Sequence, residues 1–165
     1  MAFSFLKRKK TARDMGIALL PVIKESELDE LISNSELAEL AEEIGREHLR
    51  KEILYLRLFA LDIAVSEVLG NSSAKETVSA VLHEHMRQAS FHSFEIAARL
   101  NTYNRAVRTP RSPFGSGYTM AEAIGEVFAK LCGMEKNALV ANKGALIFHG
   151  SYKYASIFIK SYKVY

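Results

Sequence analysis

Histidine and carboxylate side chains gather in the segment 81–100, which contains His83, His85, His92 and Glu95. Imidazole and carboxylate groups bind transition metals and transfer protons near neutral pH. This segment is therefore the first candidate for chemistry in the chain. Whether its side chains form a site depends on which face of a helix each of them occupies.

An apolar stripe at helical spacing predicts one helix over 73–107, with His85 and His92 on its buried face. At about 100° per residue, His83 lies roughly 140° from the centre of that stripe, so it does not chelate together with His85. His85 and His92 are about 10 Å apart along the axis, which is too far for both to reach one metal. His92 and Glu95 are one turn apart, but they would need ligands from other helices.

The preceding helix, predicted over 35–69, supplies polar groups for these histidines. If the two helices are antiparallel neighbours, facing residue numbers should sum to about 147. That rule gives three pairings, namely Asp62 with His85, Tyr55 with His92, and Lys51 with Ile96 and its neighbour Glu95. We interpret Tyr55, Asp62, His85 and His92 as a buried polar strip that fixes the register of two helices. A small-ligand pocket and a metal site are the alternatives.

The N-terminus places apolar residues directly before a run of cations, in the order Phe3, Phe5, Lys7, Arg8, Lys9 and Lys10. Apolar side chains beside cations suit weak attachment to an anionic membrane surface. We expect a flexible, basic segment over 1–24, with such membrane contact as the alternative. Salt-sensitive binding to anionic vesicles, with none to neutral vesicles, would distinguish the two.

A second basic group, Arg105, Arg108 and Arg111, leads into a loop rich in proline, glycine and serine. These arginines are candidates for binding an anion such as phosphate. Ten acidic residues lie between Glu25 and Glu52, which argues against a uniformly basic surface. Nucleic acid is therefore not the expected partner, and we expect the arginines to pair with the acidic helix.

Length and composition bound the fold. The chain has 165 residues, of which 48% are hydrophobic, enough for one domain with a core that needs no disulfide. Cys132 is the single cysteine, which fits a reducing compartment. The apolar run after the basic start is short and is interrupted by Pro21, so we expect no signal peptide and a cytoplasmic protein.

Further periodic segments complete the predicted architecture. A short helix is expected over 26–32, and Ser73 and Glu76 have the spacing of a capping box. Thr119 and Glu122 predict a second capping box, opening a helix that stops near Gly133. The segment 137–163 is one helix or two broken near Gly150, with a strand as the competitor. We predict an all-α, single-domain antiparallel bundle of four to six helices over 25–165.

The sequence contains no recognisable nucleophile, phosphate-binding loop or cofactor motif, so no catalytic residue, metal or cofactor is assigned. We expect a non-enzymatic protein that acts through protein–protein contacts. Two features favour a homodimer: blocks of opposite charge, and an aromatic tail of Tyr152, Tyr154, Phe158, Tyr162 and Tyr165.

Overall fold

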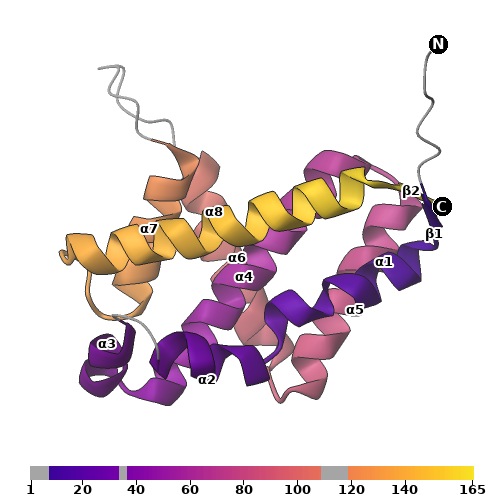
Figure 1. Cartoon of the computed structure of the whole chain (residues 1–165). Helices are drawn as coiled ribbons and strands as arrows, with labels where there is room; N and C mark the ends of the chain where they lie inside the picture. The colour runs from indigo at the N-terminus through magenta and orange to yellow at the C-terminus, as the bar shows by residue number, and fades with distance from the viewer. Residues whose placement is uncertain (1–7, 34–36, 109–118) are drawn as a thin grey trace, which may run out of the picture.

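The computed structural model describes residues 8–33, 37–108 and 119–165, and the statements below refer to these ranges. The chain is helical throughout except for one small sheet (Figure 1). The all-α prediction is confirmed. None of the helices in these ranges is long and apolar enough to cross a membrane.

The helices in chain order are α1 (Ala12–Leu19), α2 (Ser26–Ser33), α3 (Leu37–Ile44), α4 (Arg46–Leu69), α5 (Ser73–Gln88), α6 (Ser93–Arg108), α7 (Met120–Leu131) and α8 (Ala138–Lys160). A 3-10 helix, η1 (Leu20–Ile23), follows α1, and two strands, β1 (Arg8–Lys10) and β2 (Tyr162–Val164), form a parallel pair. The described ranges thus hold more helices than the four to six predicted. Because α8 lies across α4 (Figure 1), the antiparallel bundle is not confirmed.

Helix α4 is the centre of the core. The segment 53–65 is apolar almost all round, and nearly all its side chains are buried. Such a helix must be covered on several sides, and α4 contacts α3, α5, α6, α7, α8 and η1. Among the described residues, Glu52 stands out as a charged side chain that is only 1% exposed.

The predicted helix over 35–69 is wrong at its N-terminal end, because Gly45 divides it into α3 and α4. Gly45 has φ +90°, a left-handed backbone conformation that glycine adopts without a steric penalty. The apolar spacing continues on both sides of this residue. Periodicity alone therefore did not reveal the break.

The predicted helix over 73–107 is also wrong, because it is two helices separated between Gln88 and Ser93. A Schellman arrangement ends α5: the Phe91 amide donates to the Met86 carbonyl at 3.1 Å, and the Ser90 amide donates to Arg87 at 3.1 Å. Ser90 takes the left-handed position, with φ +67°. At the start of α5, the capping box predicted for Ser73 and Glu76 is wrong, because the helix begins one residue earlier and has a simple serine cap. Ser72 is the N-cap and accepts from the Lys75 amide at 3.2 Å.

Helices α7 and α8 follow the sequence more closely. The capping box of Thr119 and Glu122 is confirmed, and α7 ends at Leu131, just before Gly133. Helix α8 runs through Gly150 without a break, so the one-helix alternative is correct. A Cβ atom at Gly125 would lie 2.1 Å from the Ala141 carbonyl oxygen, so only glycine permits this close approach of the two helices.

The N-terminal segment predicted to be flexible over 1–24 is folded in its described part, residues 8–24. Met15, Leu19 and Ile23 are buried in the core. The β1 strand pairs with β2 so that Lys9 faces Lys163. Figure 1 shows this sheet at the C-terminal end of α8, joining two segments that are far apart in the sequence.

Candidate functional site

Asp62 on α4 contacts α5 through two side chains. Its Oδ1 accepts from the Ser79 hydroxyl at 3.1 Å, and its Oδ2 lies 2.7 Å from His83 Nε2. The predicted partner, His85, is therefore wrong by two positions, and His83 was wrongly excluded from the polar strip. The hydrogen bond to Asp62 raises the pKa of His83, and desolvation opposes this rise. The Asp62 and His83 side chains are 22% and 35% exposed, so water reaches the contact.

Tyr55 is buried on α4 and donates to Glu95 Oε2 on α6 at 3.0 Å. Desolvation, followed by this hydrogen bond, raises the pKa of the Tyr55 hydroxyl. The predicted partner, His92, is exposed instead and precedes the first residue of α6. The chain turns between α5 and α6, so one helical stripe could not place His85 and His92 together.

An ion pair that the sequence did not predict lies beside Tyr55, with Glu52 buried and the Arg99 side chain 34% exposed. Arg99 on α6 donates from Nε to the two oxygens of Glu52 at 2.9 and 3.1 Å, and its Nη2 lies 2.7 Å from Glu52 Oε1. Burial raises the pKa of the Glu52 carboxyl, while the Arg99 hydrogen bond lowers it. The signal in the sequence was the position of Glu52 at the edge of the most apolar stretch of the chain.

Two further reactive groups lie near this pair. The Tyr103 hydroxyl is buried and has no hydrogen-bond partner among the described residues, and its ring stacks on Phe59 at 5.2 Å. Burial raises the pKa of the Cys132 thiol to about 12, so the reactive thiolate is scarce at neutral pH. Both side chains are shut away from solvent. These features favour a structural role for the cluster over a role in catalysis.

The described residues contain no group of three or more histidine, cysteine or acidic side chains arranged to hold a metal ion. Arg105 and Arg108 are exposed in the last turn of α6, and Arg111 lies outside the described residues. Phe3, Phe5 and Lys7 also lie outside these ranges.

The basic run continues into β1, which comprises Arg8, Lys9 and Lys10. The Lys10 ammonium lies 5.2 Å from the centre of the Tyr162 ring. Membrane contact by the N-terminus stays a prediction.

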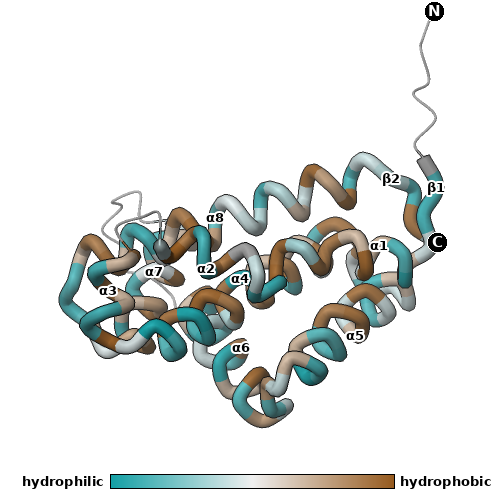
Figure 2. The backbone as a smooth tube through the Cα atoms, turned by 60° about the horizontal axis from the view of Figure 1, so that its bottom comes forward, coloured by the Kyte–Doolittle hydropathy of each residue, from teal (hydrophilic) through white to brown (hydrophobic). Residues whose placement is uncertain are grey.

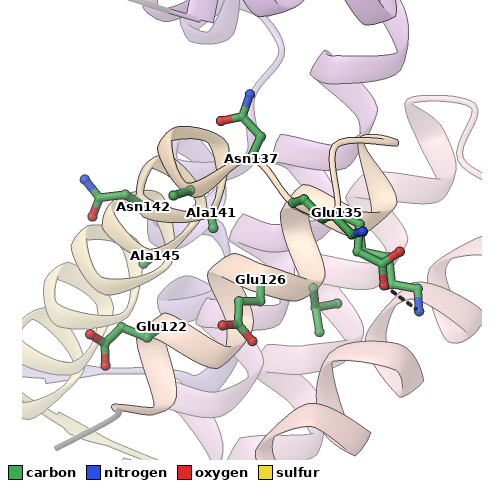
Figure 3. A pocket seen from close by; sticks show the side chains of 11 residues that line it. Glu122, Glu126, Glu135, Asn137, Ala141, Asn142 and Ala145 are labelled. Atoms are coloured by element: carbon green, nitrogen blue, oxygen red, sulfur yellow. Dashed lines mark ion pairs between the residues drawn. The ribbon is translucent and has the colours of Figure 1, made fainter.

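A cavity of about 560 Å³ lies between α7 and the start of α8 (Figure 3). Glu122 and Glu126 line it from α7, Ala141 and Ala145 line it from α8, and Glu135 forms an ion pair with Lys130 at 3.4 Å. The mixed charges at its rim and the alanines along α8 do not define a class of ligand. We assign no chemistry to this cavity.

The outer face of α8 is the most unusual surface in the described ranges. It comprises Leu139, Leu146, Gly150, Tyr154 and Ile157, and its four apolar side chains are each 50–60% exposed. Helix α8 runs along one edge of the molecule, with hydrophobic bands along its length (Figure 2). Of the aromatic tail noted in the sequence, Tyr154 belongs to this surface. Tyr152, Phe158 and Tyr162 pack partly against the core instead.

A groove of about 670 Å³ adjoins this face. Pro21 and Val22 of η1 and Leu31 of α2 line one side, and Leu146 and Tyr154 of α8 line the other. Gly150 lies between these two α8 side chains, and a Cβ atom there would meet nothing within 4 Å. The groove is therefore open and largely apolar.

No known protein family, curated protein or solved structure matches this chain. Its function is therefore inferred from its own surfaces and contacts.

Proposed function

We propose that this protein is non-enzymatic and acts through protein–protein contacts made by the outer face of α8 and its groove. The observation that carries the proposal is the row of four large, half-exposed apolar side chains on one helix, Leu139, Leu146, Tyr154 and Ile157. Large contiguous apolar patches on a folded protein are typical of interaction sites. Burying this face would be favourable by about 25 cal/mol for each Å² of apolar area removed from water.

The shape of the groove supports the same function. Leu146 and Tyr154 project on either side of Gly150, which has open space where a side chain would lie. An amphipathic helix binds such a groove by inserting apolar side chains spaced one or two turns apart. Apolar lining from η1 and α2 gives the inserted side chains contacts on both sides.

The buried polar groups support a structural role for the interior. Glu52 is almost wholly inaccessible and is satisfied by Arg99, and Tyr55 is satisfied by Glu95. Such groups hold helices in register, and a substrate would have to open the core to reach them.

Selection of displayed random peptides on the purified, immobilised protein tests this function. We expect helical, apolar peptides that bind the wild type and lose binding to Leu146→Asp, because a charge in the groove opposes apolar burial. Phe94→Asp is the matched control, since Phe94 is 83% exposed on α6 and should leave binding unchanged. Peptides that ignore Leu146→Asp, or a failure to select any, would contradict the proposal. A metal or small molecule retained in a native mass spectrum would support the ligand-binding alternative instead.

A further inference from the structure

We propose that the outer face of α8 binds a second copy of this chain, with the two α8 helices antiparallel about a two-fold axis near Gly150. This inference rests on the proposed function, that the outer face of α8 is a docking face. It adds the identity of the occupant and the geometry of the contact.

The first argument is the separation of charge along α8. At its N-terminal end, Glu39 and Glu43 of α3 line a small cavity together with Leu139, Val140 and Lys143 of α8. Both glutamates are exposed, and neither has an ion-pair partner among the described residues. The acidic end of the α8 face is therefore built by α3, which Figure 1 shows beside the start of α8.

The opposite end of α8 is basic. Lys153 and Lys160 are exposed, and neither has an ion-pair partner in the described part of the chain. Beyond them, the β1–β2 pair places Lys9 beside Lys163. Helix α8 itself contains no acidic residue. One end of this face thus carries two glutamates and one lysine, Lys143, whereas α8 contributes only lysines to the other end, so the net charge changes sign along the helix.

This polarity selects an orientation for self-association. Two copies with parallel α8 helices would place like charges together at both ends, which is unfavourable. An antiparallel, two-fold arrangement places the basic end of each copy against the acidic end of the other. The same favourable contact then occurs twice in one interface.

Two of the four apolar side chains of this face, Leu146 and Tyr154, fit the same arrangement. With the axis at Gly150, Leu146 lies opposite Tyr154 of the partner subunit, and the symmetric pair repeats the contact. Gly150 meets its own counterpart, and the absence of a side chain lets the two helices approach closely. Lys160 lies opposite Val140 of the partner subunit, a residue that shares its cavity with Glu39 and Glu43.

The size of the face is suitable for a stable dimer. Helix α8 has 23 residues and is therefore about 35 Å long. A standard interface buries about 800 Å² on each partner, which corresponds to a patch roughly 30 Å across. The face of α8, with α3 and the β1–β2 sheet at its ends, spans that dimension.

Sedimentation velocity at micromolar concentration is the first test. We expect a dimer for the wild type and for Phe94→Asp, and a monomer for Leu146→Asp combined with Tyr154→Asp. The three substituted side chains, Phe94, Leu146 and Tyr154, are exposed, so circular dichroism should show an intact fold for each variant. A monomeric wild type, or a dimer that survives the double substitution, would overturn the inference.

A charge exchange tests the orientation. Lys160→Glu alone should weaken dimerisation by about tenfold, as should Glu43→Lys alone, because each creates two like-charge contacts. The double variant should recover affinity, since it restores opposite charges with their signs exchanged. Recovery would be absent if these residues lay in separate regions of the interface.

Cross-linking tests the position of the axis. Gly150→Cys should form an intersubunit disulfide on oxidation, because a residue on the axis meets its own copy within disulfide range. The native Cys132 is buried and should contribute nothing, and Phe94→Cys is the control that should not cross-link as a dimer. Absence of the Gly150→Cys cross-link in a dimeric protein would rule out this geometry. If the wild type is monomeric but selected peptides still depend on Leu146, the docking function stands and the self-association fails.

Discussion

Two carboxylates of helix α4, Glu52 and Asp62, contact α6 and α5, and their surroundings differ. Glu52 is 1% exposed and binds the permanently charged Arg99 of α6, whereas Asp62 is 22% exposed and binds His83 of α5. Both contacts link distant parts of the sequence by charge-assisted hydrogen bonds. They differ in access to water and in whether the partner titrates near neutral pH.

This difference shows what each contact does for the fold. Water cannot readily replace Arg99 at Glu52, so losing the arginine would leave a carboxylate buried and unpaired. Water can reach Asp62 and His83, and it would compensate for much of a lost partner. We therefore interpret the Glu52–Arg99 pair as the contact that fixes α6 against α4. The Asp62–His83 contact contributes less to stability, because water can replace either partner.

Removing the arginine should have the largest effect. Arg99→Ala should lower the free energy of unfolding by about 3 kcal/mol, as measured by urea denaturation, because Glu52 would be left buried without its partner. The paired control is the double variant Glu52→Leu with Arg99→Met, which removes both charges and should lie within about 1 kcal/mol of the wild type. A loss below about 1 kcal/mol in Arg99→Ala would mean that water already solvates Glu52.

Removing the more exposed carboxylate should have a smaller effect. Asp62→Ala should lower the free energy of unfolding by about 1 kcal/mol, because it removes the acceptor of Ser79 and His83 at a hydrated position. Urea midpoints of this variant and of Arg99→Ala, measured side by side, test the ranking. If Asp62→Ala proved the more destabilising of the two, the contrast between the contacts would be wrong.

The smallest effect should be a pH dependence confined to the Asp62–His83 contact. The folded-state pKa of His83 is raised above the ordinary value of 6.5, mainly by the hydrogen bond to Asp62. Stability from this contact is therefore complete below pH 6.5 and is lost as pH rises through the raised pKa. Relative to His83→Gln, the wild-type urea midpoint should fall over that window.

The matched variant Asp62→Asn should lose the same dependence. Because these proteins all retain Glu52, the raised pKa of that carboxyl contributes equally to each of them. A constant difference between the wild type and His83→Gln across the window would show that His83 titrates alike in the folded and unfolded chains.

The two polar contacts also show how far sequence reasoning reached. The apolar segment after Glu52 predicted a helix buried on several sides, which α4 is. Periodicity also predicted that Asp62 and Tyr55 would find polar partners beyond Gly70. The predicted partner of Tyr55 was wrong because α5 and α6 were treated as one continuous helix, and the predicted partner of Asp62 was wrong by two positions within α5.

Two helix ends explain that error. Gly133 and Ser90 both take left-handed positions, with φ +75° and +67°, and both follow helices closed by the same hydrogen-bond pattern. A glycine in the sequence predicts such a helix end, because it adopts the left-handed conformation readily. Serine does not, and burial of Met86 and Phe91 on either side of Ser90 stabilises the turn. The backbone preference of glycine accounts for the end of α7 at Gly133. Tertiary packing accounts for the end of α5 at Ser90.

The sequence by itself determined the helical class, the buried character of α4, the capping box at Thr119 and the separation of acidic and basic segments. Local spacing and side-chain chemistry are sufficient for each of these. The tertiary structure alone decided that Glu52 meets Arg99, and that Lys9 lies beside Lys163 at the end of α8. These contacts join residues far apart in the chain, and they depend on the directions that turns such as the one at Ser90 give to the helices.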